Sequence, residues 1–421
     1  MGNGTSIPAH AELGDSHNFG RRVSISGDRV RKPRTLFWEW LVLAADSPLR
    51  LALDRMAREA PASSGLDANA FSFLPSLAFS GHESREGGEV ERVDLDPLPA
   101  LSDGERTRFA RLVGRSIALF AWLGVSDLHW ENLVLGVRRD GGVVFGPLDV
   151  EIILSDLSLP TETKLLPDAD PEYAALCRHA CGVRRALPWL GKPIRAGDLV
   201  AMASDYRATL ALLDRQSNAV AEALAGLPGL ADAPIRVCLR STGDYVEARR
   251  AVRRSALWPP LLDAEAEQLA RGDIPYFFRL YGRPGIHWFP EPELKELGTL
   301  PSKGDVPKLD RLLSVAKGLR SSSRKSLREE GLFALLGAFD HPSMGGKYED
   351  RGLEVAFQRR SIVLTLKGGE ELRAHRDLGA YVGSVYLPCT CGEVRTVFVP
   401  PVTTCEGGTA APPPAKVKPG R

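Results

Sequence analysis

The stretch Gly124–Leu154, GVSDLHWENLVLGVRRDGGVVFGPLDVEIIL, places polar side chains on both sides of two short apolar runs. The runs 133–137 and 143–145 flank the turn sequence Asp140-Gly141-Gly142, a pattern typical of a β-hairpin. A hairpin returns the chain to the end where it began. We therefore expect the residues before the first strand and those after the second strand to lie close together.

The polar residues at that end are typical of a site for a hard cation and a phosphate. Asp127, His129 and Asn132 form the pattern D-x-H-x-x-N before the hairpin, and Asp149 and Glu151 follow it. Carboxylate and amide oxygens bind Mg²⁺, and a further carboxylate can orient the hydroxyl that attacks a phosphoryl group. The pattern favours phosphoryl transfer. The simpler alternative is that Asp127 caps a turn, while Asp149 and Glu151 lie on the wet face of an edge strand.

Composition sets the broad class of protein. The 421 residues suffice for two or three domains, and 43% hydrophobic with 25% charged residues are ordinary for a soluble protein. With 54 basic and 53 acidic side chains, no global field attracts nucleic acid or a membrane. We find no bilayer-spanning run and no signal peptide, which predicts a cytoplasmic protein. The six cysteines form neither a disulfide framework nor C-x-x-C pairs, so no structural metal is predicted.

The N-terminal part of the chain predicts a basic hairpin behind a flexible lead-in of residues 1–13. Residues 14–36 read GDSHNFGRRVSISGDRVRKPRTL, with alternating residues, a turn at Gly27-Asp28 and Lys32 at the far end. Lys32 is placed to hold a phosphate, although a solvated basic hairpin without a ligand fits equally. Two helices follow, broken near Ser47-Pro48, and Glu39 on the first is a candidate partner for Lys32.

A long helix starting near 102–104 leads directly to Asp127, and helices are also predicted at 171–182 and 198–227. Next, a short strand is predicted to carry Arg236 and Arg240 on one face, followed by the hydroxyl of Thr242 in a turn. Together these three residues would form an anion site, unless they are surface charge on an edge strand.

After Pro290 the character of the sequence changes. Residues 306–338 predict one or two helices, 351–400 about four short strands, and 406–421 a disordered tail. We therefore divide the chain into a lead-in (1–13), a main domain (14–300), an accessory region (301–405) and the tail (406–421).

Three separated motifs resemble the dehydratase domain of class II lanthipeptide synthetases. The first is G-D-x-H-x-x-G-R-x-V followed by K-P-R, at residues 14–23 and 32–34. The second is D-L-H-x-x-N followed by D-x-E, at 127–132 and 149–151. The third is R-x-x-x-R-x-T-x-x-Y followed by G-D-I-P-Y-F, at 236–245 and 272–277. The resemblance covers roughly the first 290 residues.

The resemblance implies an α+β, kinase-like two-lobed fold of the lipid-kinase type, with a C-terminal α/β extension. It also implies an ATP- and Mg²⁺-dependent enzyme that phosphorylates Ser and Thr of a ribosomal precursor peptide carrying a leader. Elimination of the phosphate would then give dehydroalanine or dehydrobutyrine. Residues 301–421 show no Cys-His zinc pattern, so we expect any ring-closing cyclase to be a separate partner. Two alternatives stay open: a catalytically reduced relative that binds peptide or nucleotide, and a kinase that stops at the phosphopeptide.

The resemblance also implies a role for each polar residue of the motifs. Contacts with nucleotide and phosphate would come from Asp15, His17 and Lys32. Mg²⁺ would be bound by Asn132 and Asp149, with Glu151 assisting. The hydroxyl would be oriented by Asp127, with His129 beside it. Elimination would depend on Arg236 and Thr242, with Arg240 supporting the leaving phosphate.

Overall fold

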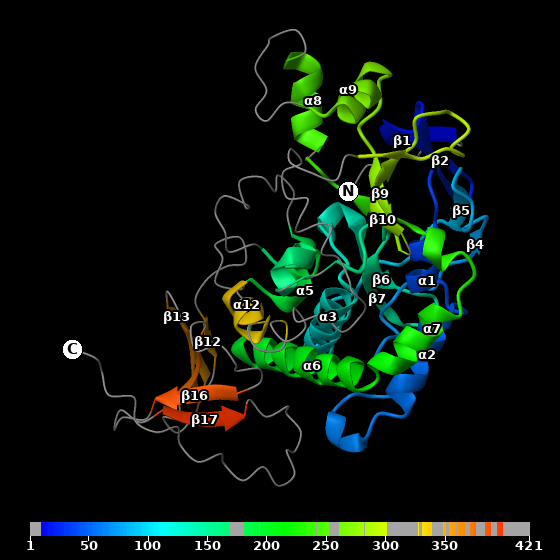
Figure 1. Ribbon diagram of the computed structural model, residues 1–421. Coiled ribbons are helices and arrows are strands. Elements are labelled where there is room, and N and C mark those ends of the chain that lie inside the picture. The colour runs from blue at the N-terminus through cyan, green and yellow to red at the C-terminus, as the bar shows by residue number, and fades with distance from the viewer. Residues whose placement is uncertain are drawn as a thin grey trace.

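A computed structural model describes residues 10–300 apart from 156, 158, 168–180, 193, 241, 252–260 and 282; beyond 300 it describes 327, 331–338 and the strands between 348 and 398 (Figure 1). Antiparallel sheets and separate helices are combined in one chain, so the expected α+β class is confirmed. Most of the helix predicted at 171–182 and the tail lie outside the described residues. No helix among the described residues is long and apolar enough to cross a membrane.

The first sheet has five strands in the order β1-β2-β3-β5-β4. Their bounds are β1 (His10–His17), β2 (Arg21–Ser26), β3 (Arg29–Lys32), β4 (Phe79–Ser80) and β5 (Gly88–Glu91). The predicted hairpin is confirmed as β2 and β3, which pair from Ser26↔Arg29 to Ser24↔Arg31 around the Gly27-Asp28 turn. Lys32 is the last residue of β3, at the far end of the hairpin, as the sequence indicated. It pairs with Gly88 of β5. Strand β1 begins inside the predicted lead-in.

The helices carry the main core. They are α1 (Phe37–Leu43), α2 (Pro48–Arg58), α3 (Asp103–Leu123), α5 (Leu187–Leu190), α6 (Ala196–Arg215) and α7 (Ser217–Ala225). The predicted break before Pro48 is confirmed, because Ser47 caps α2 by accepting a hydrogen bond from Arg50 N at 3.2 Å. Helix α3 packs along α6, and Gly124 ends α3 with φ 66°. This stop turns the chain toward Asp127.

The hairpin predicted from residues 133–137 and 143–145 is present as β6 (Leu133–Val137) and β7 (Val143–Pro147). Its register runs from Val137↔Val143 to Leu133↔Pro147, which brings residues 132 and 148 to the same end. Leu148 N donates to Asn132 O at 2.8 Å. Short 3-10 turns complete this part of the chain: η1 (Ala62–Ser64), η2 (Trp130–Asn132), η3 (Pro160–Thr163), η4 (Gly182–Arg185) and η5 (Leu230–Asp232).

The second sheet has the order β11-β10-β9-β8. It contains β8 (Pro234–Val237), β9 (Phe277–Leu280), β10 (Arg283–Trp288) and β11 (Gly298–Thr299), with α8 (Thr242–Ala251) and α9 (Asp263–Ala270) beside it. The prediction that one strand carries both Arg236 and Arg240 is wrong. If the register Val237↔Phe277 continued for two more residues, residue 239 would lie opposite Pro275. Proline has no N–H to donate, so the ladder ends before that pair.

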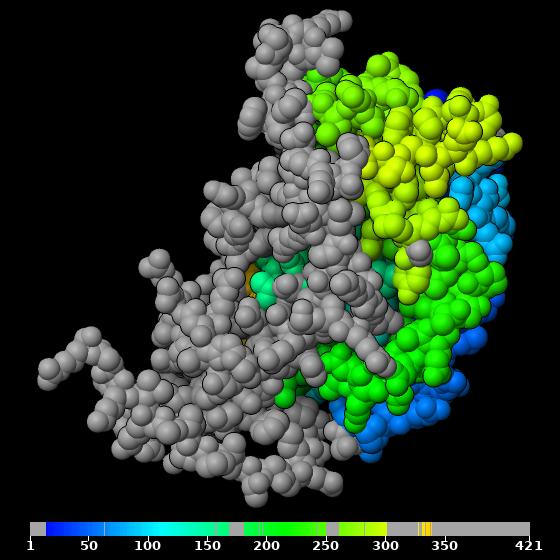
Figure 2. Space-filling view, viewed as in Figure 1, coloured from blue at the N-terminus to red at the C-terminus, as the bar shows by residue number. Residues whose placement is uncertain are grey.

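The two sheets meet at the molecular surface. In the space-filling view, residues 261–300 lie beside the segment of β4 and β5 (Figure 2). Arg21 bridges these surfaces, because its guanidinium donates to Glu86 O at 3.3 Å and to Pro292 O at 3.0 Å. The second sheet is therefore fixed against the first, next to the end of β3.

The region beyond residue 300 contains α12 (Gly331–Ala338) and six strands: β12 (Tyr348–Asp350), β13 (Leu353–Gln358), β14 (Ser361–Leu366), β15 (Glu371–His375), β16 (Ser384–Pro388) and β17 (Val394–Phe398). The strands form an antiparallel meander in chain order, whereas about four were predicted. Leu332, Leu335 and Leu336 of α12 are buried in the main core, and Tyr206 donates to Leu327 O at 3.0 Å. Part of the predicted accessory region thus completes the core of the main domain.

Candidate active site

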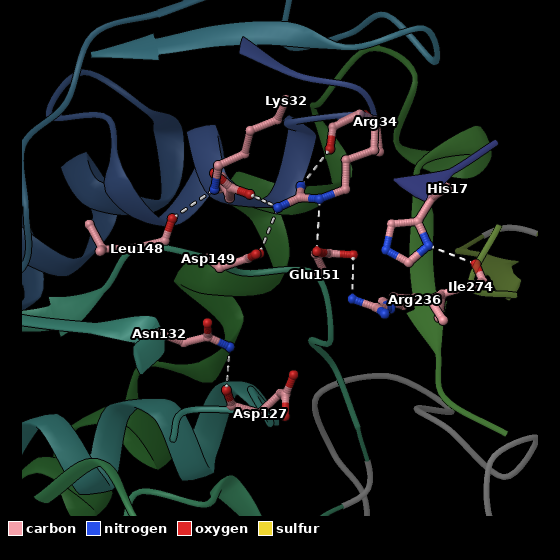
Figure 3. Close-up of polar contacts among 12 residues, drawn as sticks. His17, Lys32, Arg34, Asp127, Asn132, Leu148, Asp149, Glu151, Arg236 and Ile274 are labelled. Carbon is pink, nitrogen blue, oxygen red and sulfur yellow. Dashed lines mark hydrogen bonds and ion pairs between the residues drawn. The ribbon is translucent and has the colours of Figure 1, made fainter. Parts of the chain in front are cut away.

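The end of the hairpin faces a buried lysine. Lys32 Nζ donates to Glu39 Oε2 at 2.8 Å and to Leu148 O at 2.9 Å (Figure 3). Glu39 lies on α1 and is 1% exposed, so the contact that the sequence left open is present. The lysine is thereby fixed between the first helix and the residue that precedes Asp149.

Arg34 joins three carboxylates and was missed as a site residue by the sequence analysis. Its Nη2 contacts Glu39 Oε1 at 2.5 Å and Asp149 Oδ1 at 2.7 Å, and its Nε contacts Glu151 Oε1 at 2.8 Å. The residue is only 8% exposed. Five arginines crowd residues 21–34, so composition alone could not single it out. The available signal was the K-P-R motif, in which Arg34 stands two residues after Lys32, the last residue of β3.

The network joins three basic side chains, Lys32, Arg34 and Arg236, to three carboxyl groups, Glu39, Asp149 and Glu151. Burial raises the pKa of the Glu151 carboxyl above its ordinary value. Burial alone would raise the pKa of Asp149, but the Arg34 guanidinium, together with Lys32 and Arg236, holds that pKa well below its usual range. Strand β7 ends at Pro147, and both Asp149 and Glu151 are ion-paired with Arg34, so they do not lie on the wet face of an edge strand.

Arg236 brings the third motif into the same network. Its Nη1 lies 3.3 Å from Glu151 Oε2, and its backbone N donates to Glu151 O at 2.9 Å. The guanidinium carbon stands 5.5 Å from the ring centre of Tyr276 on the same side. Arg236, predicted as part of a separate anion site, therefore contacts the carboxyl group that follows the hairpin.

His17 adds a neutral ring beside Arg236. Its Nδ1 lies 2.8 Å from Ile274 O (Figure 3). A carbonyl oxygen only accepts, so Nδ1 carries the proton and Nε2 keeps its lone pair. Burial and the nearby Arg236 charge lower the pKa of His17 to about 4. At neutral pH the Nε2 atom can therefore accept a hydrogen bond or a proton from a substrate, whereas the ring offers a phosphate neither positive charge nor a second N–H.

The turn after His17 is held by the distant G-D-I-P-Y-F motif. Asp273 is fully buried and accepts from Phe19 N at 2.7 Å and Gly20 N at 2.9 Å. Ser16 Oγ donates to Gly272 O at 3.1 Å. Asn18 and Phe19 have φ values of 47° and 72°, which side-chain-bearing residues rarely adopt. The second half of the third motif thus positions the first motif, a role that the sequence did not reveal.

Asp127 lies at the other end of the site. Lys164 Nζ contacts Asp127 Oδ1 at 2.7 Å, and Asn132 Nδ2 donates to Asp127 O at 2.9 Å. Burial would raise the pKa of Asp127, yet Lys164 first, and then Arg236, lower it below the ordinary value. The carboxylate is thus ionised. The cap of the following turn η2 is His129, whose Nδ1 accepts from Glu131 N at 3.4 Å, so the simpler reading of Asp127 as a turn cap is wrong.

Stabilisation of the fold does not explain the Asp127–Lys164 ion pair. Their φ values are 68° and 65°, and a left-handed residue with a side chain costs about 1–2 kcal/mol. The two side chains are 31% and 28% exposed, and ion pairs in contact with solvent contribute about 0–1 kcal/mol. Lys164 was also missed by the sequence analysis, because it lies in a turn-rich loop without a local motif.

The remaining predicted residues lie elsewhere. Asp15 is exposed on β1, and Thr242 is exposed at the first residue of α8. Arg240 Nε lies 2.9 Å from Glu265 Oε1, and the fully buried Glu265 also accepts from Tyr245 OH at 2.8 Å. Of the predicted anion site, only Arg236 is shown in the charge network.

The oxygen donors fit the predicted Mg²⁺ site. Asn132 uses Nδ2 for Asp127 O, and its Oδ1 is turned toward Asp149 (Figure 3). An amide oxygen and an ionised carboxylate suit a hard cation. No group of three or more His, Cys, Asp or Glu side chains arranged to hold a metal occurs in the part of the chain that the structure describes.

No protein-family model matches the chain, and no curated protein sequence matches it significantly.

Proposed function

We propose that this protein is a lanthipeptide-type dehydratase with a kinase-like, two-lobed fold. The observation that carries the proposal is the Lys32–Glu39 ion pair at 2.8 Å, which stands over Asp149 and Asn132 at the end of a hairpin. A strand lysine paired with a helix glutamate, facing an Asn and an Asp, is the arrangement that phosphoryl transfer from ATP requires. The β1–β5 sheet with α1 would be one lobe, and α3, α6 and the β6–β7 hairpin the other.

In the first step the protein would transfer the γ-phosphoryl group of ATP to a Ser or Thr hydroxyl. Asn132 and Asp149 would hold Mg²⁺, which neutralises phosphate charge when it is bound. Lys32 would donate to a phosphate oxygen. Asp127 would orient the Ser or Thr hydroxyl. The hydroxyl oxygen would bond to the γ-phosphorus while the bond from that phosphorus to ADP breaks, and the hydroxyl proton would pass to the Asp127 carboxylate.

In the second step the phosphorylated residue would lose its α-proton to a base and its phosphate from Cβ, leaving a Cα=Cβ double bond. The departing phosphate needs cationic hydrogen-bond donors. Arg236 provides one at the edge of the charge network, with the neutral His17 beside it.

One observation favours a second candidate, a kinase that stops at the phosphopeptide. Arg240 is engaged by the buried Glu265, and Thr242 is exposed at the start of α8. Two of the three residues predicted for elimination therefore stand outside the network around Arg236. The contacts shown among the described residues therefore support the phosphorylation step more fully than the elimination step.

Mass spectrometry of peptides incubated with the protein, ATP and Mg²⁺ tests the proposal. A set of synthetic Ser- and Thr-containing peptides should show loss of water, whereas gain of phosphate alone would support the kinase candidate. Asp149→Asn should abolish both products, because it removes the ionised oxygen donor. Asp140→Asn is the matched control, since Asp140 lies in the hairpin turn and accepts from Gly142 N at 2.8 Å. Undiminished phosphorylation by Asp149→Asn would contradict the assignment.

A further inference from the structure

We infer that Lys164 is a positioning residue for phosphoryl transfer, acting by holding Asp127 on the acceptor side of the site. This inference rests on the proposed function. It adds a residue from the loop after β7, which no motif of the sequence includes. The two carboxylate oxygens of Asp127 have different roles in this inference.

Lys164 occupies one of these oxygens and leaves the other available. The contact is from Nζ to Oδ1 at 2.7 Å. Oδ2 has no hydrogen-bond partner within the described part of the chain. The two side chains are about a third exposed, so a peptide hydroxyl can reach this carboxylate from solvent. With Oδ1 held, the free oxygen has one orientation in which to accept the hydroxyl proton.

The backbone on both sides of the pair is fixed. Ser126 N donates to Ile152 O at 3.1 Å, and Leu128 N donates to Thr163 O at 3.0 Å. Ser126 Oγ also donates to Glu162 O at 2.8 Å. Two of these bonds join the residues beside Asp127 to Glu162 and Thr163, which directly precede Lys164. These bonds therefore hold the backbone before Lys164 next to the backbone of Asp127.

Both partners adopt left-handed backbone conformations, with φ values of 68° and 65°. Such strain in residues with side chains concentrates at functional sites, where the surrounding structure maintains it. Here the strain directs the two side chains at each other. Nucleotide contacts are assigned to Lys32 and Asp149, neither of which shares a hydrogen bond with Lys164 in the described structure. Loss of Lys164 should therefore slow transfer without weakening nucleotide binding.

In the phosphoryl transfer that Lys164 would assist, the acceptor oxygen forms the new bond to the γ-phosphorus while the bond to ADP breaks. The acceptor proton passes to Asp127 Oδ2. The probes are water and a pool of synthetic Ser and Thr peptides as acceptors, and Mg·ADP as the nucleotide for binding.

Lys164→Met should lower kcat about a hundredfold for both acceptors, since misplacing a catalytic group has effects of that size. The dissociation constant for Mg·ADP should stay unchanged. Lys164→Arg keeps the charge and should recover most of the rate. The matched control is Arg283→Met, which breaks an ion pair of 2.6 Å with Asp232 at the surface.

Full activity of Lys164→Met would overturn the inference and leave the proposed function standing. A loss of rate accompanied by an equal loss of Mg·ADP binding, or by a lowered Tm, would show a structural role instead. A similar loss in Arg283→Met would do the same. An unmutated protein that neither binds Mg·ADP nor forms ADP from Mg·ATP would overturn the proposed function, and this inference with it.

Discussion

The two ends of the candidate site are built on opposite principles. Around Arg34, charged side chains are buried, and each cation contacts at least one carboxylate. Around Asp127, a single ion pair is about a third exposed and its backbone is left-handed. Removing a member of the first group leaves buried charge without a partner, whereas removing the Lys164 ammonium leaves a carboxylate that is about a third exposed to solvent. The Arg34 end should therefore govern both stability and function, and the Asp127 end function alone.

The largest expected effect is that of Arg34→Met. The substitution leaves Glu39, Asp149 and Glu151 with two cations in place of three. Breaking a buried ion pair from one side costs about 3–5 kcal/mol, so the free energy of unfolding in urea should fall by about that amount. Arg139→Met is the control, because the Arg139 side chain is 91% exposed and its ion pair with Asp94, at 3.3 Å, lies in solvent. Equal effects of the two substitutions would remove the contrast between the two ends.

Arg236→Ala should separate the two chemical steps. Arg236 contacts Glu151, while Lys32, Asn132 and Asp149 keep their own contacts. Loss of one donor to a departing anion slows a step about a hundredfold or more, so phosphopeptide should accumulate. Arg236→Lys keeps the charge and should eliminate phosphate faster than Arg236→Ala. Dehydrated peptide formed at the normal rate by Arg236→Ala would place the elimination site elsewhere.

His17 should make stability depend on pH. Its pKa is lowered from 6.5 to about 4 by burial and Arg236, so between these values the unfolded chain binds a proton that the folded protein does not. Stability should therefore fall as pH decreases from 6.5 to about 4, by up to about 1.4 kcal/mol per pH unit. Above pH 6.5 the ring is neutral in both states and adds no dependence.

Urea unfolding of the unmutated protein and of His17→Gln, compared across this range, measures the effect. The variant should lose less stability than the unmutated protein as pH falls. Parallel curves for the two proteins would mean that the ring is protonated in the folded state.

Local patterns were sufficient for the two hairpins and for the start of α2, whereas the helix predicted at 198–227 is divided into α6 and α7 at Gln216. The turn residues at 27–28 and 140–142 determine both hairpins, and Ser47-Pro48 determines the start of α2. Glu39 was a candidate partner for Lys32 that the sequence left open, and the structure has this contact. These features depend on neighbours along the chain, where propensity and capping act directly.

The missed features all depend on distant partners. Asp273 holds Phe19 across 254 residues, and Arg34 contacts Asp149 across 115. Arg240 was placed on a strand because residue alternation continues past Val237, but the ladder depends on the partner strand, where Pro275 cannot donate. A single sequence does not contain the partner's register. Charge-network members can therefore be proposed from motifs, while the residues that hold them require the fold.

The smallest expected effect separates strain from charge at the Asp127 end. Lys164→Gly and Lys164→Met both remove the ammonium, so both should show the same loss of phosphoryl transfer. Glycine tolerates φ 65° without a steric penalty, so Lys164→Gly should be more stable than Lys164→Met by about 1 kcal/mol. The same two substitutions at Lys192, which is exposed and has no left-handed backbone, should show no preference for glycine. If methionine proved as stable as glycine at residue 164, the backbone there would not be strained. The contrast between the two ends would then rest on exposure alone.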